Sequence, residues 1–250
     1  FLGLTFFIQR KKAFSRKPTG YQQAQSPFSH SEEARGGAPV PGTEASEAPL
    51  ISVIIPVYNA ADTLERCLSS ILTSKVKSLE IICVNDGSKD SSGSILEEWS
   101  KRHACLKVIS QANSGVSAAR NAALKLITGK YTVFVDADDA VTPDYLANLL
   151  NAAHQYNADL IVCGYQHHLG QGKTITNTPD FNFISNLSPL ELMGLPASVC
   201  SHLYATRVIQ QSNAECAQFP LGIRYGEDTA FHFSLFARCR RVAQISENGY

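Results

Sequence analysis

The sequence has little of several features that would assign it to a common functional class. Its 250 residues carry 22 basic and 22 acidic side chains, so a net charge of zero gives no overall attraction to nucleic acid or to an anionic membrane. None of the seven cysteines forms a C-x-x-C pair, which argues against structural zinc or a disulfide framework and favours the reduced, buried thiols of a cytosolic protein. No G-x-G-x-x-G motif follows the first expected strand, which excludes a dinucleotide-dependent dehydrogenase.

The N-terminal part of the chain lacks the composition of a folded domain. Its apolar start, FLGLTFFI, is too short to cross a bilayer, which needs about 20 residues. We interpret residues 1–12 as an apolar leader that tends to associate non-specifically, rather than as the end of a membrane segment with a basic flank. Residues from about 15 to 48 are rich in Ser, Pro, Gly, Gln, Ala and Glu, so we expect a disordered leader and linker over 1–48. One domain is expected over 49–250, and Phe1 in place of Met is compatible with a fragment.

From residue 50 onward, apolar runs alternate with amphipathic segments. The apolar runs predict strands at 50–55, 79–86, 106–110, 131–135 and 159–164. The segments between them predict helices at 61–73, 91–103, 115–128 and 142–156. Short connections between continuously apolar strands are typical of an α/β fold with a mostly parallel central sheet flanked by helices on both faces. Beyond residue 164 the pattern predicts short strands or a hairpin over 165–186, helices at 188–194 and 226–239, and a last strand at 240–246.

Three of the predicted strands end in polar residues. Tyr58 and Asn59 follow the first strand, the turn 85–88 follows the second, and the turn 136–139 follows the fourth. Parallel strands bring their carboxyl ends to one edge of the sheet, which is where such sheets bind ligands. The sequence therefore predicts a ligand site at this edge.

Aspartates follow the strand at 131–135 in a D-x-D pattern. Alternate residues at a strand end point to the same side, so Asp136 and Asp138 can face one ligand. Two close carboxylates repel each other unless a cation lies between them or one is protonated. Mg²⁺ and Mn²⁺ suit such oxygen ligands and take their remaining ligands from water and substrate phosphates. The alternative is a polar turn in which Asp139 or Thr142 caps the next helix.

Other motifs allow both a functional and a structural interpretation. Asp86 can accept an N–H of a planar base, or it belongs to an ordinary strand-to-helix loop. Gly115 permits close approach of the backbone to a ligand, and Arg120 suits a diphosphate or is a solvated helix residue. Glu227 and Asp228 begin a helix, where the helix dipole favours acids, or they supply a general base.

The order of these motifs carries more information than any one of them. SVIIPVYN, VNDGSKD, NSGVSAARN, FVDADD and GED occur in sequence at the ends of successive elements. As a set they resemble the family 2 glycosyltransferases of the GT-A fold, an inverting class that includes bacterial cell-surface sugar transferases. The resemblance covers roughly residues 50 to 250 and is strongest over 51–145. It implies that 49–250 is a GT-A catalytic domain, which relatives often extend at the C-terminus.

The resemblance implies a nucleotide-sugar site at the carboxyl ends of the strands. By this similarity Pro56, Val57 and Tyr58 line the nucleotide pocket. Asp86 is expected to bind a uracil-type base, and Arg120 is expected to lie near the nucleotide or the diphosphate.

The same resemblance divides the acidic residues between metal binding and catalysis. Asp138 is the expected main ligand of Mn²⁺ or Mg²⁺, and Asp136 is expected to contact the ribose or the sugar and to share the metal. Asp228 is the expected general base, and Glu227 is expected to support it or the acceptor. Relatives often have a Trp and a Lys where this chain has Cys200 and His202, which leaves the recognition of the acceptor open.

The implied function is the transfer of a sugar from a nucleoside-diphosphate sugar, expected to be UDP-linked, to a hydroxyl of a glycan or lipid-linked acceptor in cell-surface polysaccharide synthesis. Such a protein is expected in the cytoplasm, with peripheral association at the inner face of the cell membrane. One alternative is an inactive sugar-nucleotide-binding module. Another is a haloacid dehalogenase-like phosphatase, whose D-x-D-x-x-x-T pattern FVDADDAVT imitates, although three strand–helix units precede the motif here.

Overall fold

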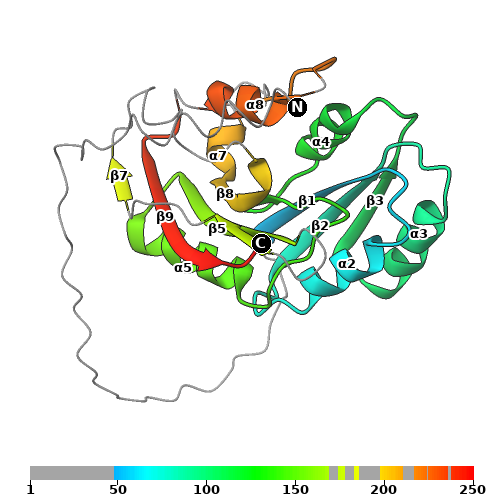
Figure 1. Cartoon of the computed structure of the whole chain (residues 1–250), viewed down its shortest axis with the longest axis horizontal. Coiled ribbons are helices and arrows are strands. Elements are labelled where there is room, and N and C mark those ends of the chain that lie inside the picture. The colour runs from blue at the N-terminus through cyan, green and yellow to red at the C-terminus, as the bar shows by residue number, and fades with distance from the viewer. Residues whose placement is uncertain are drawn as a thin grey trace, which may run out of the picture. The chain divides into compact units, whose positions relative to one another are not determined.

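Figure 1 shows the computed structural model of the chain, with a central sheet that has helices on both of its faces. The structure describes residues 48–168, 174–177, 183–185, 198–210, 217–223, 225–235 and 238–250. The predicted linker up to residue 47 and the predicted helix at 188–194 lie outside the described residues. Among the described residues, no helix has both the length and the apolar character needed to cross a membrane.

The elements follow the predicted alternation closely up to residue 168. The strands are β1 Ile51–Val57, β2 Leu79–Asn85, β3 Leu106–Ser110, β4 Tyr131–Phe134, β5 Leu160–His168, β6 Thr174–Asn177, β7 Phe183–Ser185, β8 His202–Ala205 and β9 Arg241–Asn248. The helices are α2 Leu64–Leu72, α3 Ser92–Arg102, α4 Val116–Leu124, α5 Tyr145–Tyr156, α7 Thr206–Ile209 and α8 Glu227–Leu235. The short 3₁₀ turn η2, Val199–Ser201, precedes β8.

The sheet has the order β3-β2-β1-β4-β8-β5-β9-β7, with β6 paired to the end of β5. β1 is parallel to both β2 and β4, and β2 is parallel to β3. β8 is antiparallel to both of its neighbours, β4 and β5, so β5 and its parallel partner β9 point in the same direction as β4. The predicted α/β class with a mostly parallel core flanked by helices is therefore confirmed.

Two apolar layers hold the helices against the sheet. Successive side chains of a strand point to opposite faces, so Val53 and Ile55 join one buried cluster and Ile54 joins the other. The first cluster contains residues of α2, α3 and α5, and the second contains residues of α4, α7 and α8. In Figure 1 these two sets of helices lie on opposite sides of the sheet. Because both faces are covered, the carboxyl edge of the strands is left for polar loops.

The structure adds one strand that the sequence did not predict. β8 is a strand within SVCSHLYAT, where no strand was expected, and it inserts between β4 and β5. The short strands or hairpin predicted over 165–186 are present in part, since residues 165–168 pair antiparallel with β6, but residues 165–168 continue β5 beyond its predicted end at 164. Five of the six described cysteines are buried, as the sequence predicted, and Cys105 is partly buried.

Candidate active site

A pocket of about 660 Å³ lies at the carboxyl ends of β1, β2 and β4. Its volume is in the range usual for small-molecule sites. Of the site residues that the sequence predicted, Asp228 does not line this pocket. All the others do: Pro56, Val57, Tyr58, Asp86, Gly115, Arg120, Asp136, Asp138 and Glu227. The parallel register explains this convergence, since Val57 pairs with Asn85 of β2 and Ile54 pairs with Phe134 of β4.

The wall formed by the end of β1 combines a buried residue with an exposed aromatic one. Val57 is buried, whereas the Tyr58 side chain is 48% exposed. Asn59 has a left-handed backbone with φ of 49°, and its side-chain oxygen accepts a hydrogen bond from the Lys89 N–H at 2.8 Å. This contact joins the loop after β1 to the loop after β2, next to the half-exposed Tyr58 that lines the pocket.

Asp86 is buried beneath the loop that leads into α4. Its Oδ1 accepts hydrogen bonds from Gln111 Nε2 at 2.7 Å and from the Ser114 N–H at 2.9 Å, and its Oδ2 accepts one from the Gly115 N–H at 2.8 Å. Gly115 has φ of 88°, a conformation that favours glycine. Asp86 thus shapes the loop 111–115 through contacts that the sequence analysis missed. Its predicted contact with a base stays a prediction.

The D-x-D turn is held mainly through its backbone. The Asp139 N–H donates to the Asp136 carbonyl at 3.1 Å and closes the turn. The Arg66 guanidinium donates to the Asp138 carbonyl at 2.5 Å, and the Thr63 hydroxyl donates to the carbonyl between the two aspartates at 3.0 Å. The Asp138 side chain is exposed and lines the pocket, so its carboxylate is available to a ligand.

The described residues include no group of three or more His, Cys, Asp or Glu side chains that could hold a metal ion without help. Asp136 and Asp138 are the two carboxylates that line the pocket from one turn. Two carboxylates fit Mg²⁺ or Mn²⁺, because these ions usually keep several waters and bind substrate phosphates as further ligands. The donor set therefore fits a divalent ion that arrives with a phosphate-bearing substrate.

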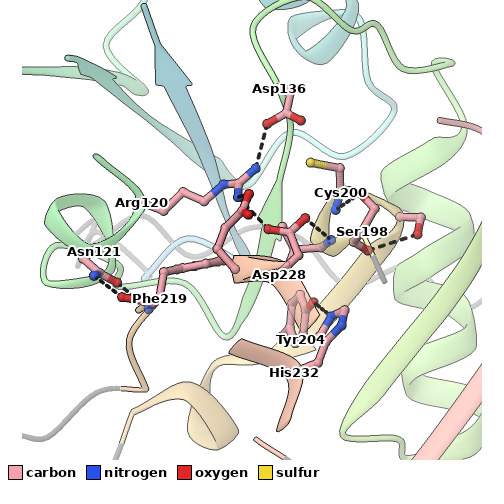
Figure 2. A network of polar contacts seen from close by, with 12 residues as sticks. Arg120, Asn121, Asp136, Ser198, Cys200, Tyr204, Phe219, Asp228 and His232 are labelled. Carbon is pink, nitrogen blue, oxygen red and sulfur yellow. Dashed lines mark hydrogen bonds and ion pairs between the residues drawn. The ribbon is translucent and has the colours of Figure 1, made fainter. Parts of the chain in front are cut away.

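Arg120 lies between the D-x-D turn and α8, as Figure 2 shows. Its side chain is only 3% exposed, and it contacts Asp228 Oδ1 at 2.7 Å, Asp136 Oδ1 at 3.0 Å and Glu227 Oε1 at 3.7 Å. Burial by itself lowers the pKa of the guanidinium, but Asp136 and Asp228 outweigh this effect and raise the pKa above its ordinary value. Arg120 is therefore a buried cation that joins three acidic residues, and not a solvated helix residue.

Asp228 is not among the residues that line this pocket, although it follows Glu227, which does, and its side chain is 19% exposed. Its Oδ2 accepts a hydrogen bond from the Val199 N–H at 3.2 Å, while Oδ1 faces Arg120. Burial raises the pKa of the Asp228 carboxyl above its ordinary value, although Arg120 and the Val199 N–H act in the opposite direction. A carboxylate with a raised pKa is a stronger base than an exposed aspartate.

Tyr204 of β8 and His232 of α8 belong to a buried cluster of aromatic and imidazole rings, and Figure 2 shows these two side chains facing each other. The Tyr204 hydroxyl is hydrogen-bonded to His232 Nε2, and the His202 ring stacks on Tyr204 with centroids 5.8 Å apart. Burial lowers the pKa of His232 from 6.5 to about 4 and also lowers the pKa of His202. His202 therefore packs in the core, and it does not contact the described pocket.

We expect the free energy of unfolding to fall as the pH is lowered from about 6.5 to about 4. The unfolded chain protonates His232 near 6.5, whereas the folded protein does so only near 4. Over this window His232 contributes about 1.4 kcal/mol per pH unit, or about 3 kcal/mol in all, and above the window it contributes no pH dependence. Urea unfolding at several pH values measures the slope. His232→Gln should make the slope less steep, although the buried His202 still contributes in the same direction, whereas His154→Gln, at an exposed position, should leave the slope unchanged. Equal slopes in the wild type and His232→Gln contradict the assignment.

Comparison with known proteins assigns the chain to a family. Residues 52–237 match the family model described as Glycosyl transferase family 2. The chain belongs to glycosyltransferase family 2. The match confirms the family expected from the order of the motifs, and it excludes the phosphatase alternative. The residues that line the pocket and those of α8 all lie inside the matched range.

Relatives in this glycosyltransferase family include two that match most of the chain. The uncharacterized glycosyltransferase EpsJ of Bacillus subtilis (strain 168) is 33% identical over 212 residues, which is 81% of this chain and 60% of EpsJ. Glycosyltransferase GlyA of Streptococcus pneumoniae serotype 4 is 33% identical over 214 residues, which is 80% of this chain and 30% of GlyA. The chain thus spans only part of the length of these relatives.

Solved structures of glycosyltransferases share the fold. Staphylococcus aureus TarS 1–349 in complex with UDP-GlcNAc has a TM-score of 0.68 and 22% identity, over 80% of this chain and 57% of that chain. The mannosyltransferase PcManGT of Pyrobaculum calidifontis, in complex with GDP-Man and Mn²⁺, has a TM-score of 0.58 and 19% identity, over 81% of this chain and 56% of that chain. These similarities agree with the predicted GT-A fold.

Proposed function

We propose that this chain is the donor-binding and catalytic part of a metal-dependent, inverting glycosyltransferase. It would move a sugar from a UDP-linked donor to a hydroxyl of a glycan or lipid-linked acceptor in cell-surface polysaccharide synthesis. The observation that carries the proposal is the pocket at the carboxyl ends of β1, β2 and β4, where Asp136 and Glu227 contact the buried Arg120 and Asp138 lines the same pocket. Peripheral association with the inner face of the cell membrane is part of the same proposal.

The pocket offers separate surfaces for the parts of a nucleotide sugar. Tyr58, half exposed, presents an aromatic face at one wall, and Asp86 lies at the floor of the same pocket. The base is proposed to bind here, between the loops after β1 and β2. The backbone of Gly115 at the start of α4 lines the pocket as well, and the N-terminus of a helix attracts the negative charge of phosphates.

Asp138 and Asp136 are the residues that would hold Mn²⁺ or Mg²⁺. When bound, such an ion neutralises negative charge on a departing diphosphate. Asp138 is suited to be the main ligand because it is exposed at the pocket, whereas Asp136 Oδ1 already faces Arg120. PcManGT, whose structure contains GDP-Man and Mn²⁺, supports the choice of cation.

Asp228 is the proposed general base, and Glu227 is proposed to assist it or to hold the acceptor. The acceptor oxygen forms a bond to the anomeric carbon as the bond to the diphosphate breaks, and the acceptor proton passes to Asp228. Attack opposite the leaving group inverts the anomeric carbon, so an α-linked donor gives a β-glycoside. Burial favours this role because it raises the pKa of Asp228.

A UDP-linked donor together with Mn²⁺ is expected to raise the melting temperature of the full chain. A ligand that binds only the native state stabilises it by mass action, by about 2.7 kcal/mol at one hundred times its Kd. We would screen UDP-, GDP- and TDP-sugars, each with Mn²⁺, Mg²⁺ or EDTA, and then measure nucleotide release and glycan product with the donor that binds. Stabilisation without any turnover supports the inactive binding module, and no stabilisation by any sugar nucleotide contradicts the proposal.

Asp138→Ala tests the metal in the same assay. The variant should lose the Mn²⁺-dependent part of the thermal shift, because it lacks the carboxylate that reaches the pocket from the D-x-D turn. Asp144→Ala is a matched control, since Asp144 forms an exposed ion pair with Lys75 and does not line the pocket. An unchanged Mn²⁺ response in Asp138→Ala would rule out Asp138 as the main ligand.

A further inference from the structure

The hydroxyl of Tyr250 joins both ends of the D-x-D turn. It accepts a hydrogen bond from the Asp136 N–H at 3.2 Å and donates one to Asp139 Oδ2 at 2.6 Å. Asp138, whose side chain reaches the pocket, lies between these two residues. One phenolic oxygen, from a residue two positions beyond β9, therefore contacts Asp136 and Asp139, which lie on either side of the proposed main metal ligand.

Tyr250 is itself fixed by several independent contacts. The Tyr250 carbonyl accepts from the Gln166 N–H at 2.9 Å, and the Gly249 carbonyl accepts from the Thr142 N–H at 2.9 Å. The Tyr250 ring lies 5.9 Å from the Tyr145 ring, centroid to centroid. A Cβ atom at Gly249 would lie 2.9 Å from Tyr145 Cδ2, so only glycine lets the backbone pass this close. The hydroxyl thus has a defined position behind the turn.

The two hydrogen bonds of the Tyr250 hydroxyl are compatible with each other. A phenol oxygen both donates and accepts, so it can give its proton to the Asp139 carboxylate while it accepts the Asp136 N–H.

We infer that Tyr250 is a positioning residue for the divalent cation, because its hydroxyl holds the D-x-D turn in the shape that presents Asp136 and Asp138 to the pocket. The inference rests on the proposed function. Groups that orient metal ligands from outside the first coordination shell typically contribute about 10–100-fold to metal affinity. Tyr250 does not line the pocket, so its hydroxyl is expected to act on the metal and not on the nucleotide directly.

Tyr250→Phe in the full chain tests the inference, because it removes the hydroxyl and keeps the ring. The Mn²⁺ concentration that gives half of the UDP-dependent thermal shift is expected to rise about 10–100-fold. The Kd for UDP in EDTA should stay within a factor of about two, since the aromatic wall and Asp86 are untouched. If Tyr250 had only a structural role, the melting temperature of the variant would fall, but the Mn²⁺ half-saturation would not change separately from the Kd for UDP.

Tyr145→Phe is the matched control. It also removes a phenolic hydroxyl from this part of the core, one that donates to the Cys200 carbonyl at 2.8 Å and does not contact the turn. Its Mn²⁺ half-saturation should equal that of the wild type. A similar rise in Tyr145→Phe and Tyr250→Phe would overturn the inference, because it would show a general loosening of the core.

Asp139→Ala approaches the same hydrogen bond from its other end, and it serves if Tyr250→Phe folds poorly. It should raise the Mn²⁺ half-saturation concentration as well. In the double variant of Tyr250→Phe and Asp139→Ala, this concentration should be no higher than in the single variant with the larger effect. A wild-type value in Tyr250→Phe or Asp139→Ala overturns the inference while the proposed function stands. A wild-type chain that binds UDP equally with and without Mn²⁺ overturns the inference and the metal dependence together.

Discussion

Asp228→Asn is expected to lower sugar transfer by about 10²–10⁴-fold and to leave the Kd for the donor unchanged, as loss of a general base predicts. The separation of the two effects follows from where Asp228 lies. Its carboxylate does not line the pocket, so the nucleotide sugar loses no wall residue. The acceptor hydroxyl, in contrast, loses the group that is proposed to take its proton. Transfer is measured as UDP release from the bound donor with glycan or lipid-linked acceptors, and as hydrolysis with water.

The Asn variant should remain folded because most of the local contacts survive. The amide oxygen can face Arg120, which contacts Asp228 Oδ1 at 2.7 Å. The amide nitrogen then faces the Val199 N–H, so the hydrogen bond at 3.2 Å is lost. The lost hydrogen bond costs about 1 kcal/mol, and Asp136 and Glu227 still neutralise the buried Arg120 after the Asp228 charge is removed, so a domain of this size should tolerate the change. A loss of activity is therefore attributable to the missing base.

Glu227→Gln is the matched control for this experiment. Glu227 is the neighbouring acid, it lines the pocket, and it lies 3.7 Å from Arg120 Nη1. If Asp228 is the base, Glu227→Gln should reduce transfer less than Asp228→Asn does. Near-normal transfer in Asp228→Asn, with a large loss in Glu227→Gln, would move the role of the base to Glu227. Near-normal transfer in both variants contradicts a carboxylate base from α8.

The pH profile gives a further readout of the same variant. The base acts in its deprotonated form, so kcat/KM should fall as the pH drops through the pKa of Asp228. Because burial raises that pKa, the fall should begin at a higher pH than an exposed aspartate would give. The residual activity of Asp228→Asn should lack this fall at low pH, the acidic limb of the profile. Persistence of the limb in the variant would assign it to another group.

The parts of the site that the sequence predicted are those with local signals. The strands before Tyr58, Asp86 and Asp136 are short apolar runs, and polar residues mark the points where they end. Parallel pairing then brings those ends together without any further information. For this reason the pocket walls, and the acids that line them, could be named before the structure was known.

The parts that the sequence did not predict depend on contacts between residues far apart in the chain. Tyr250 lies 114 residues from Asp136, and Arg120 lies 108 residues from Asp228, so no local pattern connects either pair. β8 was missed for a similar reason. Its four residues are identified as a strand by pairing with β4 and β5 on its two sides, and not by their own periodicity.

Arg120→Met is expected to lower the free energy of unfolding by about 3 kcal/mol, because it leaves buried carboxylates without their cation. The Asp228 side chain is 19% exposed and the Asp136 side chain is 38% exposed, so solvent compensates part of the loss. The cost should therefore lie at the lower end of the range found when one partner of a buried ion pair is removed. Methionine keeps most of the volume of the arginine side chain, so packing against Phe219 changes little. Urea unfolding at pH 7 measures the change.

Two further variants separate buried charge from other effects of the substitution. Arg102→Met breaks an exposed pair with Glu98 and should cost less than about 0.5 kcal/mol. Arg120→Lys keeps the charge, but a single ammonium cannot contact Asp136 and Asp228 in the way the two guanidinium nitrogens do, so it should recover only part of the stability. A cost for Arg120→Met as small as that for Arg102→Met would mean that the acids of α8 and the D-x-D turn do not depend on Arg120. In that case the position of Asp228 would have to be set by α8 and the Val199 N–H alone.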